Sequence, residues 1–278
     1  DKTSWVCFLA TDSYGAFSEE RCIRIYVVRP APSFVSPPAS SSLASAPLAL
    51  EAVVGCQLSI DIVAQDLTSG RHVTAQQALS NGYAVRIESE ASIALSQYGQ
   101  TRLPGLPSGA VLDASDREFG NPVSRVFHWT PARGQESFTY LVCFNLLDSL
   151  GTYNSASTQF RSEFCTEVRV ARCRYCMQAG DSLYSIAHEW GTLWMNLWAG
   201  NELLLKPGQA QDKTLLYLGP LYSASHQDSI ISLASKFSVS VKDILSWNPD
   251  LEAQVQGDLS LQLFNGSEIC VLPSTCTK

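Results

Sequence analysis

The chain has 278 residues, of which 45% are hydrophobic and 16% are charged, and its formal net charge is −7 at pH 7. This length suggests two domains or a few small ones, and the acidic balance offers no basic stripe for phosphates, which makes nucleic acid a poor partner. No run approaches the roughly 18 apolar residues that span a bilayer, so we expect no membrane span within the chain. Because the sequence begins at Asp1, we expect it to be a piece of a longer protein.

Residues 1–28 predict a β-hairpin. The runs 5–9 and 22–28 are rich in β-branched and aromatic residues, and they flank a turn at Asp12-Ser13-Tyr14-Gly15. Two strands alone are marginally stable in water. We therefore expect residues 1–28 to be the C-terminal strands of a truncated immunoglobulin-like repeat.

The hairpin recurs in the middle of the chain, where Cys143-Phe144 and Cys165 match Cys7-Phe8 and Cys22. Many short strands with regular turns are typical of a β-sandwich. We expect residues 29–171 to form one complete all-β repeat of this kind. Its predicted strands lie at 58–64, 83–88, 123–129, 138–146 and 163–170.

A second kind of repeat fills the C-terminal part of the chain. Residues return 47 positions later: Tyr175, Asp181, Ser182, Ala187, Asn201 and Gly219 recur as Tyr222, Asp228, Ser229, Ala234, Asn248 and Gly266. A fixed period indicates a duplicated structural unit. We place the first unit at residues 172–220 and the second at residues 221–278.

Each unit predicts a strand, two helices and a second strand. Apolar residues of the first unit follow the spacing of one helix face, at Leu183, Ile186, Ala187 and Trp190. Asp181 and Asp228 stand just before the first helix of their units, where a short acidic side chain can cap free amides.

These units resemble LysM, a carbohydrate-binding module, in two tandem copies over residues 174–273. The resemblance rests on Tyr175-x-x-x-x-Gly180-Asp181-Ser182-Leu183-x-x-Ile186-Ala187, on Asn201, and on the ending Gly266…Cys270-Val271-Leu272-Pro273. The second copy has His226-Gln227-Asp228 where Pro-Gly-Asp is usual, and the first has Glu202 where Pro usually follows Asn. The family implies a small α+β (βααβ) fold that holds glycans of N-acetylglucosamine in a shallow groove.

That groove lies between the loop that enters the first helix and the loop that leaves the second. Carried onto this chain, the resemblance implies the groove residues Gly180, Asp181, Ser182, Leu183, Asn201, Glu202 and Leu203 in the first copy, and Gln227, Asp228, Ser229, Ile230, Asn248, Pro249, Asp250 and Leu251 in the second. Helix capping also explains the two aspartates, and helix termination also explains the two asparagines. Since Trp190, Trp194 and Trp198 are more tryptophans than so small a unit can hide, we expect one of them to be exposed.

Short motifs within residues 30–171 resemble the cadherin-like or immunoglobulin-like repeats of surface proteins. They are Ala64-Gln65-Asp66, Leu106-Pro107-Ser108-Gly109-Ala110-Val111-Leu112-Asp113 and Asp148-Ser149-x-Gly151. With the LysM units they resemble green-algal cell-surface or flagellar surface glycoproteins. The carboxylates Asp61, Asp66, Asp113 and Asp116 could gather around calcium, but solvated turns explain them better, and we expect no metal.

The chain has nine cysteines, which favours disulfides in an oxidising compartment. Zinc at Cys173-Arg174-Tyr175-Cys176 would need a second pair at short spacing. We expect Cys7 to pair with Cys22 and Cys143 with Cys165, because these cysteines recur together. The rival is a bridge between the sheets from Cys56 to Cys143. The remaining bridges would staple the LysM units internally, through Cys173, Cys176, Cys270 and Cys276, with Cys56 left over.

No catalytic motif is found. His188-Glu189 lacks the second histidine of a zinc protease, and neither a nucleophile elbow nor a nucleotide-binding glycine loop occurs. We expect no enzyme and no cofactor. Asn265-Gly266-Ser267 is an N-glycosylation sequon.

We therefore interpret the chain as a piece of a large extracellular or cell-surface structural glycoprotein, with the flagellar or ciliary surface as one location. Its β-repeats would build a rod, and its LysM pair would dock other copies or neighbouring surface proteins. The alternative is a carbohydrate-binding adhesin that holds a wall or matrix glycan through the LysM pair.

Overall fold

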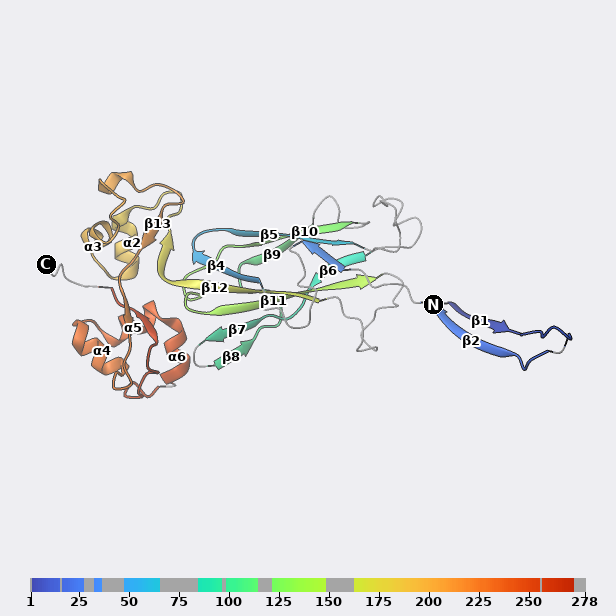
Figure 1. Cartoon of the computed structure of the whole chain (residues 1–278). Coiled ribbons are helices and arrows are strands. Elements are labelled where there is room, and N and C mark those ends of the chain that lie inside the picture. Colours follow the sequence, from blue (N-terminus) through green and yellow to red (C-terminus); the bar gives the residue numbers. More distant parts are fainter. Residues whose placement is uncertain are drawn as a thin grey trace.

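The computed structural model describes residues 2–15, 17–27, 33–36, 48–65, 85–96, 99–114, 122–148, 163–255 and 257–272. Along the chain these residues form a β-hairpin, a two-sheet β-sandwich and a helical region that contains the last described strand (Figure 1). Within them, no helix is long and apolar enough to cross a membrane.

The N-terminal hairpin consists of β1 (Lys2–Phe8) and β2 (Arg21–Val27), which pair antiparallel with Cys7 directly opposite Cys22. A disulfide joins these two cysteines, as expected. Neither strand pairs with any other described strand. Phe8 is 56% exposed, whereas its counterpart Phe144 in the complete repeat is fully buried. The phenylalanine that is buried in the complete repeat is therefore exposed in the hairpin.

The sandwich consists of two sheets, and the predicted all-β fold is confirmed. The smaller sheet has the order β3-β5-β10-β9. Its strands are β3 (Ser33–Ser36), β5 (Leu58–Gln65), β9 (Ala110–Ala114) and β10 (Val123–Trp129). In the larger sheet, β11 and β12 are central, β4 pairs with β12 in parallel, and β6 pairs with β11. Its sandwich strands are β4 (Leu48–Val54), β6 (Val85–Ser89), β7 (Ile93–Ser96), β8 (Gly99–Arg102), β11 (Thr139–Asp148) and β12 (Glu163–Cys176).

The core between the sheets follows from alternating side chains. Along β5, Ile60 and Ile62 are buried while the intervening Asp61 is exposed. Phe127 and Phe144 meet edge to face across the core, with ring centroids 5.8 Å apart. The sequence does not predict β8, because all four of its residues are exposed and lack the apolar alternation that marks a half-buried strand.

Strand β12 serves both the sandwich and the helical region. Its register against β4 shifts between Val170 and Tyr175, and Cys173 adopts a φ of 59° in this stretch. Residues 174–176 then pair with β13 (Leu215–Tyr217). The boundary expected between residues 171 and 172 therefore falls inside one continuous strand.

The helical region contains two modules of the expected strand–helix–helix–strand order. The first joins the end of β12 to α2 (Leu183–Trp190), α3 (Trp194–Ala199) and β13, with a short 3-10 turn, η1 (Pro207–Gln209), before β13. The second contains β14 (Leu221–Ser223), α4 (Ile230–Phe237), α5 (Val241–Trp247), α6 (Pro249–Val255) and β15 (Glu268–Cys270). Helix α6 is an addition that the first module lacks.

The capping residues are the serines and not the aspartates. The Ser182 hydroxyl accepts a hydrogen bond from the Ser185 amide at 3.0 Å, and the Ser229 hydroxyl accepts one from the Ser232 amide at 3.2 Å. The prediction that Asp181 and Asp228 cap these helices is wrong. A serine supplies the acceptor that a helix start requires equally well, so capping leaves the aspartates free for another contact.

The 47-residue period holds as far as Asn201 and Asn248 and does not continue to the last strand of each module. Asn201 bonds the amide of Tyr217, 16 residues later, whereas Asn248 bonds the amide of Cys270, 22 residues later. The last strand of the second module is therefore displaced by six further residues. Gly219 and Gly266 are consequently not equivalent, because Gly219 follows β13 and Gly266 precedes β15.

Four disulfides join described cysteines. Cys143 is bonded to Cys165, as expected. Cys56 is bonded to Cys176 and Cys173 to Cys270. The expectations that Cys56 is left over and that Cys176 forms a bridge within the LysM units are therefore wrong, whereas Cys173–Cys270 joins the two units as expected. Because β4 pairs in parallel with β12, the turn that contains Cys56 lies at the end of β12. Cys56 and Cys176 are 120 residues apart in the sequence, so the sequence alone does not indicate that they are close. Cys276 lies outside the described residues.

Candidate functional site

Two loops of each module form the candidate site. The β–α loop precedes the first helix and comprises residues 177–182 in the first module and 224–229 in the second. The α–β loop precedes the last strand and comprises residues 200–214 and 257–267, respectively.

In both modules an aspartate ties the β–α loop to the preceding strand. The Asp181 carboxylate accepts hydrogen bonds from the Tyr175 hydroxyl at 2.8 Å and from the Gln178 amide at 2.7 Å. Burial, and then the hydrogen bond to Asp181, raises the pKa of Tyr175. The aspartate thus fixes the shape of the loop from within.

Asp228 makes the matching contacts in the second module. Its carboxylate accepts from the Tyr222 hydroxyl and from the Ser225 amide, both at 2.8 Å. Burial opposes its charge, but the hydrogen bonds from Ser225 and Tyr222 and the nearby Lys236 ammonium outweigh burial and lower the pKa of Asp228. Asp228 is therefore held as a carboxylate.

Each asparagine holds its second helix against the last strand. The Asn201 amide group donates to the carbonyls of Leu197 and Tyr217, and its oxygen accepts from the Tyr217 amide at 2.8 Å. Asn248 makes the same three contacts with Ile244 and Cys270. Both side chains are buried and fully bonded, so neither extends into solvent.

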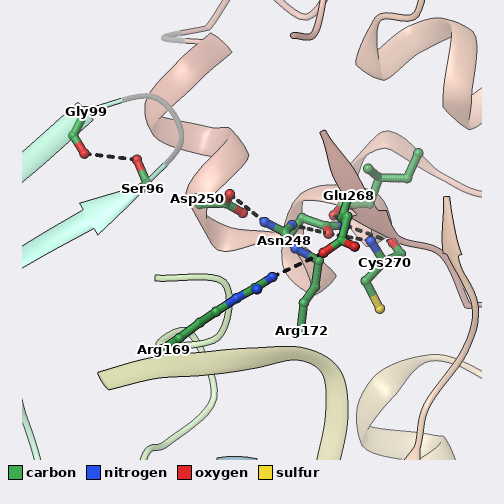
Figure 2. A network of polar contacts seen from close by, with 9 residues as sticks. Ser96, Gly99, Arg169, Arg172, Asn248, Asp250, Glu268 and Cys270 are labelled. Carbon is green, nitrogen blue, oxygen red and sulfur yellow. Dashed lines mark hydrogen bonds and ion pairs between the residues drawn. The ribbon is translucent and has the colours of Figure 1, made fainter. Parts of the chain in front are cut away.

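In the second module, the segment that follows α5 packs against the sandwich. Figure 2 shows Arg172 from β12 reaching Asn248 and Asp250, with distances of 2.6 Å to each side-chain oxygen. Arg169 from the same strand pairs with Glu268 at 3.1 Å (Figure 2). Asp250 is fully buried. This segment is therefore part of the contact between the module and the sandwich.

The predicted groove residues divide into two groups. The buried ones are Leu183, Asn201, Ile230, Asn248, Asp250 and Leu251. The exposed or half-buried ones are Gly180, Asp181, Ser182, Glu202, Leu203, Gln227, Asp228, Ser229 and Pro249. Among the described residues, side-chain access is therefore more extensive in the loops of the first module.

Further exposed apolar residues of the first module were not singled out from the sequence. Tyr184 in the first turn of α2 is 70% exposed, and Leu205 in the α–β loop is 76% exposed. Trp190 is buried and Trp198 is partly exposed, with its indole N–H donating to the Leu204 carbonyl at 2.7 Å. Tyr184 and Leu205 could have been found from their positions, because apolar residues in a loop or on the polar face of a helix are not needed for the core.

The described residues contain two groups that combine cysteines with an acidic side chain at metal-binding distances. They are Cys7, Glu20 and Cys22, and Cys143, Glu163 and Cys165. In both groups the sulfurs are joined in a disulfide, so they offer no thiolate to a metal. Asp66 and Asp116, which the calcium hypothesis requires, lie outside the described residues. Asn265 is exposed in the turn before β15.

Residues 177–209 and 227–270 match the LysM domain. These two segments fall on the two modules. No curated protein sequence matches the chain.

Several solved structures align with part of the chain at low identity. The immunoglobulin domain of Dpr1 bound to DIP-eta shares 11% identity, with 51% of this chain and 96% of that chain covered and a TM-score of 0.23. A tandem of titin immunoglobulin domains shares 10% identity, with 58% of each chain covered and a TM-score of 0.23. The sialic acid binding region of a Streptococcus sanguinis SK1 adhesin bound to 3'sLn shares 13% identity, with 63% of this chain and 41% of that chain covered and a TM-score of 0.24.

The chain spans less than two thirds of the titin and adhesin chains. All three TM-scores are low, so these proteins support no statement about ligand or partner. The chain combines a two-sheet β-sandwich with a small α+β region whose two modules match the LysM domain.

Proposed function

We propose that this chain is a non-enzymatic carbohydrate-binding protein whose LysM region holds a glycan built of N-acetylglucosamine. The observation that carries the proposal is the match of both modules to the LysM domain, together with exposed loops at the place where that domain holds sugar. Exposed backbone groups beside apolar side chains suit a sugar, which presents hydrogen-bonding groups at its edge and an apolar ring face.

An extracellular site of action fits the covalent structure. The described residues contain four disulfides, which form and persist in oxidising compartments. A location on a flagellar surface is the more specific expectation from the sequence, and attached sugar at Asn265 would support the secretory route.

Sedimentation with insoluble polysaccharides tests the proposal. We expect the full chain to sediment with chitin, a polymer of N-acetylglucosamine, and to remain in solution with cellulose, which lacks acetamido groups. Soluble chitohexaose should release the bound chain. Equal sedimentation with both polymers, or with neither, would contradict the proposal.

A structural role as a scaffold is the second candidate, and the joint between the sandwich and the modules favours it. Strand β12 is continuous through that joint, and the bridges Cys56–Cys176 and Cys173–Cys270 reinforce it on two sides. We propose that a joint held in this way resists bending. Stable high-order assemblies in sedimentation velocity, formed without any glycan, would support this candidate over the first.

A further inference from the structure

The second module fills the space between its own two loops. The carbonyl of Asp228 accepts a hydrogen bond from the Leu263 amide at 2.8 Å, and the amide of Ile231 donates to the Leu259 carbonyl at 3.4 Å. Ser229 and Gln262 form an isolated β-bridge between the same segments. The α–β loop is thus bonded to the β–α loop and to the first turn of α4.

The first module leaves the corresponding groups open. They are the carbonyl of Asp181 and the amide of Tyr184, each 47 residues before its counterpart. Among the described residues, neither group has a backbone hydrogen bond to residues 200–214. The reason is length, because 16 residues separate Asn201 from its strand partner where 22 separate Asn248 from its own. The shorter segment between Asn201 and its strand partner contains no counterpart of α6, and none of the described residues 200–214 reaches back as Leu259 and Leu263 do in the second module.

The two α–β loops also differ in how strongly they expose apolar side chains. Leu203 is 93% exposed and Leu205 is 76% exposed on the α–β loop of the first module, whereas in the second Leu263 is buried and Leu261 and Phe264 are 42% and 57% exposed. Exposed leucines are costly to hydrate. Where a loop carries two of them, contact with a ligand offsets that cost.

We infer that only the first module binds the glycan, and that the second module, with its groove filled, holds the LysM region onto the sandwich. This inference rests on the proposed function. The filling segment in the second module is a peptide, which offers one N–H and one C=O to the two backbone groups opposite. A ligand in the first module would offer the same pair, and the acetamido group of N-acetylglucosamine has both, with a methyl group that can contact the leucines.

Contacts with β12 hold the second module against the sandwich. Arg172 binds Asn248 and Asp250 of the second module, and Cys173 is bonded to Cys270. The segment that would form one wall of a groove is therefore buried against β12. Its side chains serve the interdomain contact in place of a ligand.

Calorimetric titration of the full chain with chitohexaose tests the inference, and one site per chain is expected. Replacing Leu203→Ser together with Leu205→Ser should weaken binding roughly tenfold, because two apolar contacts are lost. The matched control is Leu261→Ser together with Phe264→Ser, which alters two exposed apolar residues of the second α–β loop. This control should bind like the unaltered chain.

The outcomes separate the two hypotheses. Absence of binding by the unaltered chain contradicts the proposed function itself. Two sites per chain, or equal weakening by the two double variants, overturns the inference and leaves the proposed function standing. Backbone NMR needs no substitution: the Tyr184 amide resonance should shift during titration while that of Ile231 stays in place, and the reverse pattern would also overturn the inference.

Discussion

Arg172 and Asp250 form a buried ion pair that joins the sandwich to the second LysM module. The Arg172 Nη2 atom lies 2.6 Å from the Asp250 Oδ2 atom, and the two side chains are 4% and 0% exposed. The other terminal nitrogen of Arg172 donates to Asn248 at 2.6 Å. Because a buried charge is costly unless it is paired, this contact selects one orientation of the module on β12.

Removing one partner of this pair should destabilise the chain strongly. Arg172→Met leaves the Asp250 carboxylate buried without a counter-charge, and we expect the free energy of unfolding to fall by about 3–5 kcal/mol. The double variant Arg172→Met with Asp250→Leu should recover most of the loss, because apolar packing then replaces the pair. Urea unfolding followed by tryptophan fluorescence measures both. A single-variant loss as small as that of an exposed pair, below about 1 kcal/mol, would contradict the buried geometry.

Peptide mapping without reduction should recover two long-range cross-links, Cys56 to Cys176 and Cys173 to Cys270. Recovery of a free thiol at Cys56 from the oxidised chain would refute the first of these.

The cross-link from Cys56 to Cys176 should also stabilise the joint. We expect Cys56→Ser with Cys176→Ser to lower the free energy of unfolding by about 2–4 kcal/mol. Cys7→Ser with Cys22→Ser is the matched control. Since the hairpin pairs with no other described strand, this control should leave the unfolding transition of the sandwich unchanged.

The role of Asn201 can be separated from ligand binding. Asn201→Ala leaves the Leu197 carbonyl and both backbone groups of Tyr217 without their partner, and we expect a loss of about 2–3 kcal/mol in the free energy of unfolding. The affinity for chitohexaose per folded molecule should stay unchanged. A weaker affinity at unaltered stability would instead show that this side chain reaches the ligand.

Glu136 should make stability depend on pH. Burial raises the pKa of its carboxyl above the ordinary value, and the hydrogen bond from the Gly134 amide and the charges of Arg133 and Arg172 only partly offset this. The folded chain therefore keeps a proton that the unfolded chain has released, so the free energy of unfolding should fall as the pH rises from the ordinary pKa through the raised one. Glu136→Gln should remove this decrease.

Urea unfolding of both proteins over a series of pH values, from acid to mildly alkaline, measures this decrease. Parallel curves for the two proteins across that range would contradict the assignment to Glu136.

Local patterns in the sequence predict part of the secondary structure and one of the disulfides. The spacing of Leu183, Ile186 and Trp190 predicts α2, and the alternation along residues 58–64 predicts β5, because both patterns depend only on which face of an element is apolar. The recurrence of Cys143 with Cys165 predicts their bridge, since adjacent antiparallel strands bring such residues together.

Contacts between residues that are distant in the sequence follow from long-range strand pairing and packing. Cys56 reaches Cys176 over a separation of 120 residues because β4 runs parallel to β12, and no local pattern encodes that pairing. The family resemblance places Asn248 and Asp250 in the groove, yet both side chains are bonded to Arg172 and buried against the sandwich. Both modules contain the first two helices because apolar periodicity fixes a helix locally, whereas the contact between the two loops of a module depends on long-range hydrogen bonds.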